Sequence, residues 1–155
     1  MENKELRELY FDALAEIDGL TEVELGEEND ICFNNGESDY YWFYADEKDI
    51  KTARLCFHCS SHFKDDDEKL RAVRLFNHIN KKIKMVKMFH DEETGDITAR
   101  VDFFVTGIQP AGDGFLFNDK ERFVENLLLA LSAIEEATDY FFDEMGWRGG
   151  ANAEI

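Results

Sequence analysis

Residues Leu70 to Met145 place a helix, a strand pair and a second helix in direct succession, and this order limits the folds open to the chain. A helical apolar stripe over 70–81 is followed by two strands joined at Asp91–Asp96, and then by a long helix with its own apolar stripe. Strands joined by so short a loop must be antiparallel, because a parallel pair needs a crossover of about a dozen residues. The segment therefore predicts helices packed on an antiparallel sheet.

The part of the chain before residue 64 predicts one more helix and a strand meander. Over 2–18, apolar residues recur at the three-to-four spacing of a helix with one buried face. Short alternating segments follow, with Asn34-Asn35-Gly36 as a strong turn signal. Val23 with Leu25 and Ile31 with Phe33 are short alternating pieces of this meander, which continues in the predicted strands Tyr40–Tyr44 and 52–63.

The remaining elements complete the predicted fold. The segments 84–90 and 96–106 predict a second strand pair, and Gln109–Gly114 predicts a longer loop. Asn118 and Glu121 have the spacing of a helix cap, and the helix after them runs through Phe142. The prediction is an α+β fold in the order α-βββ-α-ββ-α, with one antiparallel sheet of about five strands packed against three helices.

The helix over 70–81 has a clear predicted start and a clear predicted buried face. Asp65 and Glu68 have capping-box spacing, with Asp in place of the usual Ser or Thr. The apolar stripe that should face the core is Leu70, Val73, Phe76 and Ile79. With 155 residues and no linker, the chain predicts a single domain over 1–145 and a flexible tail over 146–155.

The net charge of −18, from 35 acidic and 17 basic residues, restricts the partners. A surface this negative repels phosphate backbones and anionic membranes, so we expect no nucleic-acid or membrane partner. A basic protein segment or a cation is a better electrostatic match, although solubility alone also explains the charge. The sequence has no apolar run of about 20 residues, no signal-peptide pattern and only three cysteines. These features predict a cytoplasmic protein.

The segment Cys56-Phe57-His58-Cys59-Ser60-Ser61-His62 has the residue types of a zinc site. On an extended strand, Cys56 and Cys59 point to opposite faces, whereas Cys56, His58 and His62 share one face. A three-ligand metal site on that face is an alternative, but ordinary strand packing is the interpretation we favour. A closed four-ligand site would need a second Cys or His pair, and the sequence contains none.

No motif in the chain predicts catalysis or a cofactor. The sequence has no Walker loop, no dinucleotide-binding glycine pattern and no GxSxG elbow. The Asp91–Asp96 loop lacks the ligand spacing of an EF-hand, so it predicts a charged hairpin turn. The prediction is a non-enzymatic protein without a cofactor; a small enzyme without a recognisable signature is a second alternative.

Five consecutive aromatic residues, Tyr40 to Tyr44, make up one predicted strand. Period-two alternation places Tyr40, Trp42 and Tyr44 on one face, and Tyr41 and Phe43 on the other. Other elements could cover both faces. Alternatively, one face is a contact surface for a partner, and Tyr40, Trp42 and Tyr44 are the candidate partner-binding residues.

Several segments carry a resemblance to a known family. They are Asp18-Gly19-Leu20 at a helix end, Asp30-Ile31-Cys32-Phe33 before the aromatic strand, Asn77-His78-Ile79-Asn80, Lys84-Met85-Val86-Lys87-Met88 and Phe141-Phe142-Asp143-Glu144-Met145. Together they resemble the YbjN family of bacterial sensory transduction regulators, which shares the fold of type III secretion chaperones. The cysteine segment and the run of five aromatics depart from that pattern.

The resemblance implies a fold and a role. It implies helices packed on one antiparallel sheet and a non-enzymatic function in binding a protein partner, as a regulator or a chaperone-like factor. From the secretion chaperones, it also implies a homodimer. These are expectations by analogy, because a fold does not fix a function.

Overall fold

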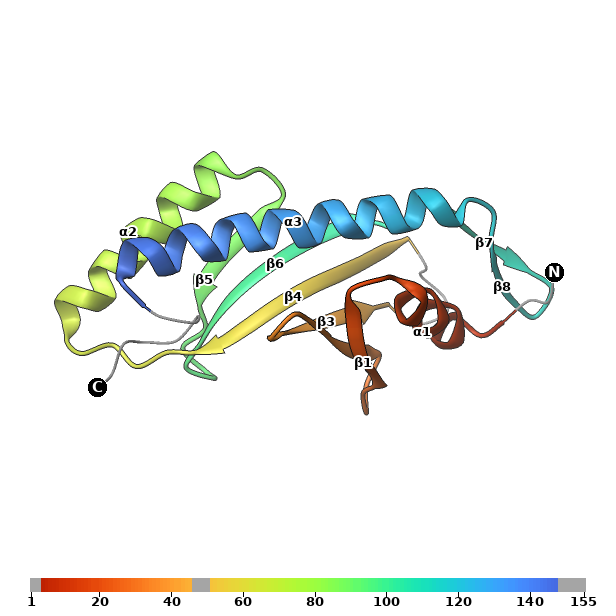
Figure 1. The fold of residues 1–155 in the computed structure, drawn as a ribbon, viewed down its shortest axis with the longest axis horizontal. Coiled ribbons are helices and arrows are strands. Elements are labelled where there is room, and N and C mark those ends of the chain that lie inside the picture. The colour runs from red at the N-terminus through yellow and green to blue at the C-terminus, as the bar shows by residue number, and fades with distance from the viewer. Residues whose placement is uncertain (1–3, 46–50, 148–155) are drawn as a thin grey trace. The chain divides into compact units, whose positions relative to one another are not determined.

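The structure is a computed structural model, and it describes residues 4–45 and 51–147 (Figure 1). In chain order, the described elements are α1 (Leu6–Glu16), β1 (Leu20–Leu25), β2 (Asp30–Asn35), β3 (Ser38–Tyr44), β4 (Thr52–Ser60), α2 (Asp66–Lys82), β5 (Val86–His90), β6 (Asp96–Phe104), β7 (Ile108–Ala111), β8 (Gly114–Phe117) and α3 (Lys120–Met145).

The sheet confirms the predicted α+β class and corrects the predicted element order and number of strands. Six antiparallel strands follow the order β1-β2-β3-β4-β6-β5, and β7 and β8 form a separate hairpin. In the described residues the element order is therefore α-ββββ-α-ββββ-α, in place of α-βββ-α-ββ-α. The hairpin lies where a loop was predicted over Gln109–Gly114. A two-stranded hairpin tolerates Pro110, since its missing N–H can face outwards, and Gly112 adopts the positive φ of a tight turn.

Two compact units divide the chain, and each is described separately. Unit 1 comprises residues 1–55 and 102–129, and unit 2 comprises residues 56–101 and 130–155. Strands β4 and β6 and helix α3 contribute residues to both units. The expectation of one domain over 1–145 stays a prediction.

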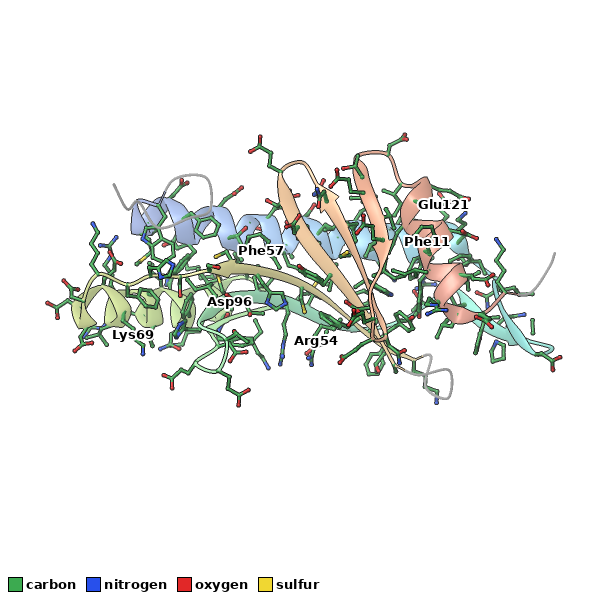
Figure 2. All side chains as sticks on the ribbon, turned by 90° about the horizontal axis from the view of Figure 1, so that it is seen from below. Phe11, Arg54, Phe57, Lys69, Asp96 and Glu121 are labelled. Carbon is green, nitrogen blue, oxygen red and sulfur yellow. The ribbon has the colours of Figure 1, made fainter. Side chains whose placement is uncertain are left out.

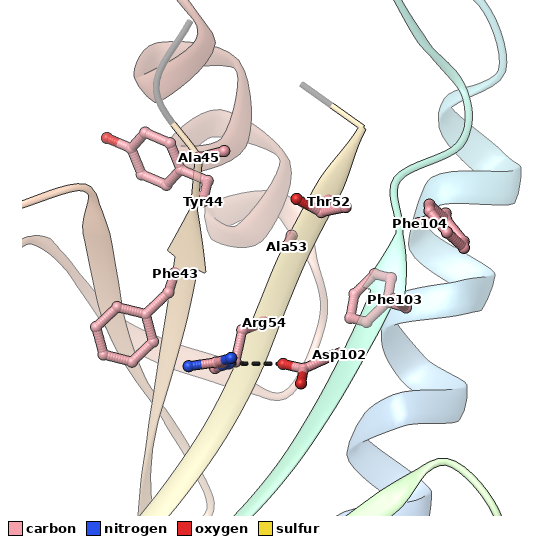
Figure 3. A pocket seen from close by; sticks show the side chains of 9 residues that line it. All are labelled: Phe43, Tyr44, Ala45, Thr52, Ala53, Arg54, Asp102, Phe103 and Phe104. Carbon is pink, nitrogen blue, oxygen red and sulfur yellow. Dashed lines mark hydrogen bonds and ion pairs between the residues drawn. The ribbon is translucent and has the colours of Figure 1, made fainter. Parts of the chain in front are cut away.

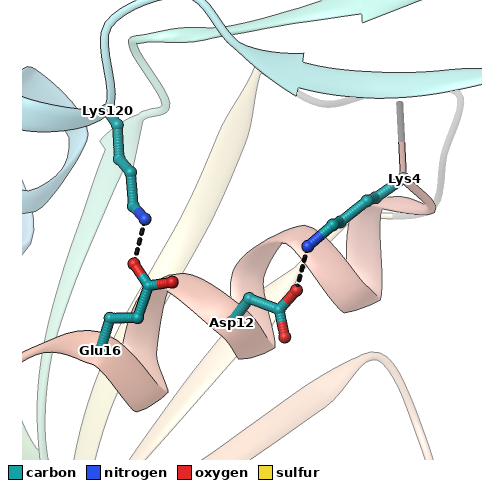
Figure 4. A network of polar contacts seen from close by, with 4 residues as sticks. All are labelled: Lys4, Asp12, Glu16 and Lys120. Atoms are coloured by element: carbon teal, nitrogen blue, oxygen red, sulfur yellow. Dashed lines mark hydrogen bonds and ion pairs between the residues drawn. The ribbon is translucent and has the colours of Figure 1, made fainter. Parts of the chain in front are cut away.

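Aromatic rings from α1, β3 and α3 form the core of unit 1. Tyr10 of α1 contacts Trp42 of β3 and Phe123 of α3, with ring centroids 5.2 and 5.7 Å away. Such pairs add to the hydrophobic stabilisation that the buried rings provide. Near the surface, Lys4 pairs with Asp12 and Lys120 pairs with Glu16 (Figure 4). The second pair joins the start of α3 to the end of α1.

The core of unit 2 is a second aromatic cluster. Phe141 of α3 stacks on Phe76 of α2, with centroids 4.9 Å apart, and meets Trp147 edge-on at 5.3 Å. Phe57 of β4 contacts Phe142 from the sheet side. Figure 2 shows Phe57 and Arg54 on the same strand. They belong to opposite faces because strand side chains alternate. The contact of Phe57 with Phe142 indicates that the face with Phe57 is the one that α3 covers.

The predicted stripe of α2 is only half correct. Phe76 and Ile79 are buried, but Leu70 and Val73 are exposed, and Ala72 is fully buried instead. A helix repeats every 3.6 residues, so a buried face centred on Ala72, Phe76 and Ile79 turns Leu70 and Val73 towards solvent. The small Ala72 lets the helix approach its neighbours closely.

The starts of α2 and α3 test the two predicted caps. Asp65 accepts a hydrogen bond from the Glu68 backbone N–H at 2.8 Å, which confirms the first cap. At α3, the cap is Asp119, which accepts from the Arg122 N–H at 3.1 Å. The Asn118 amide instead donates to Gln109 of the β7–β8 hairpin. The second cap is therefore one residue later than predicted.

Helix α3 ends at the boundary predicted between the domain and the tail. Gly146 has a φ of 72°, and the N–H groups of Gly146 and Trp147 donate back to Asp143 and Phe142. This is a Schellman motif, which reverses the chain direction after a helix. It returns Trp147 to the core of unit 2, where its exposed fraction is only 6%. Trp147 therefore packs in that core, and residues 148–155 of the predicted tail lie outside the described residues.

Asn80, near the end of α2, closes one edge of the sheet. Its side-chain oxygen accepts from the Met88 N–H at 2.8 Å, and its amide donates to the Met88 carbonyl at 3.0 Å. Met88 lies in β5, which is the last strand in the sheet order. Asn80 therefore makes the two hydrogen bonds that a further strand would otherwise make at this residue. In residues 4–45 and 51–147, no helix has the length and hydropathy needed to cross a membrane.

Candidate functional site

The predicted contact residues Tyr40, Trp42 and Tyr44 lie in the core, and this corrects their prediction as a partner-binding surface. Their exposed fractions are 2%, 0% and 8%. Helices α1 and α3 cover this face of β3, as the contacts of Trp42 with Tyr10 and Phe123 demonstrate. A partner cannot reach these three side chains without unpacking the core of unit 1.

The same cluster contains two buried polar groups. Among the described residues, the Tyr10 hydroxyl and the Trp42 ring nitrogen are buried without a hydrogen-bond partner. Burial raises the pKa of Tyr10, since the phenolate would be far from water, and the neighbouring Tyr44 adds to the shift. Tyr10 therefore stays a neutral phenol at any physiological pH, and the cluster has a packing role.

The opposite face of β3 carries Tyr41 and Phe43, which are half-buried and stack with their centroids 6.2 Å apart. Phe43 lies at one side of a groove of about 540 Å³ within unit 1, shown in Figure 3. The residues that line this groove are Phe43, Tyr44, Ala45, Thr52, Ala53, Arg54, Asp102, Phe103 and Phe104. Its volume is in the range of ligand sites, and its lining is mostly apolar.

Phe104 is the most exposed large apolar side chain of the described residues, with an exposed fraction of 76%. It is the last residue of β6. The pairing of β6 with β5 ends at Val101 opposite Val86, so Asp102 to Phe104 extend beyond that partner strand. An aromatic ring left in water costs free energy that docking of an apolar group would recover.

Arg54 and Asp102 are the charged side chains among those that line the groove. Arg54 Nε donates to Asp102 Oδ1 at 2.6 Å, as the dashed line in Figure 3 marks. Both side chains are about half exposed, so the pair adds little stability. The pair brings one cation and one anion together in the groove lining.

The strand pairing of β2 with β3 adds further carboxylates to the face that carries Tyr41 and Phe43. Asp30 is directly opposite Phe43 in the register, and Asn34 is opposite Asp39. Asp39 is exposed and lies two residues before Tyr41, so it projects from the same face. The two rings are therefore flanked by Asp30 and Asp39 within unit 1.

The cysteine and histidine segment does not assemble into a metal site. Strand β4 ends at Ser60, so the shared face predicted for Cys56, His58 and His62 does not extend to His62. Cys56 is buried, and His58 Nδ1 lies 2.9 Å from Thr98 Oγ1 on β6. In the parts of the chain that the structure describes, no three His, Cys, Asp or Glu residues could hold a metal ion together.

The pKa values of the Cys59 thiol and the His58 imidazole are both shifted, and the shift of Cys59 makes its thiol less reactive. Burial raises the pKa of Cys59 to about 12, and Asp96 adds to the shift. Burial lowers the pKa of His58, although Asp96 and Asp91 oppose that change. A thiol with so high a pKa has almost no thiolate at neutral pH, so Cys59 is a poor nucleophile.

Sequence reasoning missed the groove residues Arg54, Asp102 and Phe104. A signal existed in the alternation of β6, where apolar residues occupy Ile97, Ala99, Val101 and Phe103. Phe104 breaks this pattern, because it is a large apolar residue on the face that otherwise carries polar groups. The groove itself could not be read from the sequence, since β3 and β6 are about 60 residues apart in the chain.

The comparisons with known proteins add no identification. No protein-family model matches the chain, and no curated protein matches it at a significant level. The resemblance to the YbjN family therefore stays a prediction.

Proposed function

We propose that the protein is a non-enzymatic binding module, and that the groove of unit 1 takes a segment of another protein. The observation that carries the proposal is Phe104, a largely exposed aromatic side chain beside an apolar groove of about 540 Å³. Exposed aromatic anchors next to a groove are typical of protein-binding surfaces. The two charges in the groove would then fix the orientation of the bound segment.

Two features make binding a better explanation than catalysis. The charged groups that line the groove, Arg54 and Asp102, are ion-paired with each other, whereas an active site needs a nucleophile or a general base aimed at a substrate. The other residues that line the groove supply aromatic rings, small apolar side chains and the hydroxyls of Tyr44 and Thr52. This set can bind and orient a ligand, and it offers no obvious way to activate one.

The wider role follows the same proposal. A regulator or chaperone-like factor, as the YbjN resemblance implies, would act by holding such a segment, in the cytoplasm and without a cofactor. A homodimer, a metal-binding factor built on Cys56, His58 and His62, and an enzyme without a signature are each separate hypotheses. None of the contacts described above favours them over the groove.

Site-specific photocrosslinking tests this function. A benzoylphenylalanine residue at position 104 should crosslink one defined protein in cells that express the chain. The same residue at position 129, in place of Leu129, is the matched control, because Leu129 is also exposed (61%) but lies on α3 outside the groove. Identical products from both positions, or no protein product from position 104, would refute the function.

A further inference from the structure

We propose that the segment bound in the groove is extended and alternates basic and large apolar side chains. The proposal rests on the proposed function and specifies the chemistry of its partner. Its first observation is that the two units differ in net charge. Unit 1 holds 21 acidic and 7 basic residues, and unit 2 holds 14 acidic and 10 basic residues. Their net charges are therefore −14 and −4, so most of the negative charge belongs to the unit that contains the groove.

The charge is arranged around the aromatic rings as well as summed over the unit. Asp30 is opposite Phe43 across the β2–β3 pair, and Asp39 lies two residues from Tyr41 on the same strand face. Asp102 stands at the other side of the groove, next to Phe103 and Phe104. Arg54, the cation of the groove lining, pairs with Asp102, which leaves Asp30 and Asp39 as the carboxylates of this face outside that ion pair. The face is thus apolar along its centre and anionic at the border that Asp30 and Asp39 form.

An extended peptide matches such a face better than a helix or a compact surface does. Its side chains alternate in direction, and those on one side are about 6.7 Å apart. Phenylalanine or leucine side chains could then cover Phe43 and Phe104, while lysine or arginine side chains reach the carboxylates of Asp30 and Asp39. The cations would also gain from the faces of Tyr41 and Phe43, because an aromatic face attracts positive charge.

Electrostatic repulsion disfavours an acidic segment as the partner. An acidic segment would bring carboxylates next to Asp30 and Asp39 within a unit of net charge −14. Such a juxtaposition of like charges in a partly buried interface is strongly unfavourable. The charge therefore selects among segments that the apolar groove alone would accept.

Fluorescence anisotropy with four labelled twelve-residue peptides tests the chemistry. One alternates Lys with Phe and Leu, the second replaces Lys by Glu, the third replaces Lys by Ser, and the fourth keeps Lys but replaces the apolar residues by Ser. We expect the Lys and Phe/Leu peptide to bind about tenfold or more tightly than each of the others. We also expect its affinity to fall as NaCl rises from about 50 to about 500 mM, because salt screens the carboxylates.

Substitutions in the protein test whether the peptide binds in the groove. Phe104→Ser should weaken the Lys and Phe/Leu peptide about tenfold, and Asp30→Asn should weaken it about threefold while preserving the acceptor oxygen that bonds the Glu28 N–H. The matched controls are Leu129→Ser, for an exposed apolar residue elsewhere, and Glu93→Gln, for an exposed acid of unit 2. Both controls should bind the peptide as the unaltered protein does.

The outcomes separate this inference from the proposed function. Equal or tighter binding of the Glu or Ser peptide, together with a specific crosslink at position 104, would overturn the partner chemistry and leave the function intact. Weak binding of all four peptides and no crosslink would overturn both. A dimer on light scattering that Phe104→Ser dissociates would also overturn the inference, because the groove would then bind a second copy of the chain.

Discussion

Units 1 and 2 have cores of the same kind and surfaces of different kinds. Each core is a cluster of aromatic rings, around Trp42 and Phe123 in unit 1 and around Phe141 and Trp147 in unit 2. The acidic excess, in contrast, is concentrated in unit 1, which has a net charge of −14 against −4 for unit 2. If solubility were its only purpose, the charge could be spread evenly. The acidic excess instead belongs to the unit that contains the aromatic groove.

The two edge strands of the sheet, β1 in unit 1 and β5 in unit 2, are protected against pairing with another strand in different ways. Strand β1, in unit 1, pairs with β2 through a register shift between Thr21 and Glu24, and Glu22 has a positive φ of 51°. Irregular backbone and charged side chains both discourage another strand from pairing there. Strand β5, in unit 2, is regular, and Asn80 occupies the hydrogen-bonding groups of Met88 instead. One edge is protected by irregularity and charge, and the other by a single side chain.

The largest expected effect tests whether the two cores are energetically equal. Phe123→Ala in unit 1 and Phe141→Ala in unit 2 remove fully buried rings from the same helix. Each should lower the free energy of unfolding by about 3–5 kcal/mol, because a cavity adds to the lost hydrophobic burial. Urea denaturation monitored by fluorescence measures both changes.

The two tryptophans make that experiment specific to each unit. Trp42 reports on unit 1 and Trp147 on unit 2, so Trp147→Phe and Trp42→Phe backgrounds isolate the two signals. We expect coincident unfolding midpoints, since α3, β4 and β6 contribute to both units. Separate midpoints would contradict a single cooperative transition and would make the two units independent in folding.

The second prediction concerns the protected edge of unit 2. Asn80→Ala leaves the N–H and carbonyl of Met88 without the side chain that bonds them, which should cost about 1–3 kcal/mol. It should also increase self-association through β5, measurable by light scattering. The control is Asn77→Ala, one helical turn earlier and exposed, which should change stability by less than about 0.5 kcal/mol. Equal effects from both substitutions would exclude a special role for Asn80.

The third prediction uses the histidine of unit 2. Burial holds the pKa of His58 below its ordinary value of 6.5, despite the opposing charges of Asp96 and Asp91. The unfolded chain therefore takes up a proton on this residue at a higher pH than the folded protein does. The contribution of His58 to the free energy of unfolding should be fully present above pH 6.5. It should be lost as the pH drops from there through the folded-state pKa of His58.

A variant isolates that contribution. His58→Gln should make the free energy of unfolding less dependent on pH between about 7 and 5, as measured by urea titrations at each pH. His62→Gln is the comparison, because His62 is an exposed residue of the same segment. If the pH dependence is the same in unaltered protein and His58→Gln, the buried imidazole does not contribute.

The smallest expected effect compares one surface ion pair from each unit. A double-mutant cycle on Glu16 and Lys120 in unit 1 should give a coupling energy of about 0.2–1 kcal/mol that decreases with salt. Lys69 and Glu92 in unit 2 are 3.6 Å apart, and Glu92 is almost fully exposed. Their coupling should be smaller. A larger value for Lys69 and Glu92 would mean that exposure does not control these pairs.

Local signals predicted much of the fold. The stripe of α3, from Phe123 through Ile134 to Phe141, is buried as its spacing indicates, and Asp65 caps α2 as predicted. These features depend on residues within one helix, where spacing directly determines which side chains share a face. The hairpin of β7 and β8 was missed because Pro110 and its neighbouring glycines were interpreted as a loop.

The candidate site was much harder to predict, because it depends on contacts between distant segments. Arg54 and Asp102 are 48 residues apart in the chain, and nothing in either local sequence links them. The run of five aromatics was correctly divided between two faces, but the face with Tyr40, Trp42 and Tyr44 is the one that α1 and α3 cover. Alternation separates the faces of a strand and does not say which face other elements will cover.

The three cysteines differ in burial, so their rates of chemical labelling report on local opening of the folded chain. Cys32 is half-buried in unit 1, whereas Cys56 is buried and Cys59 is poorly ionised in unit 2. A maleimide or iodoacetamide pulse therefore marks Cys56 and Cys59 chiefly when unit 2 opens. Peptide mass mapping of the labelled sites would then time the opening of unit 2 against the labelling of the half-buried Cys32 in the same sample, without any mutation.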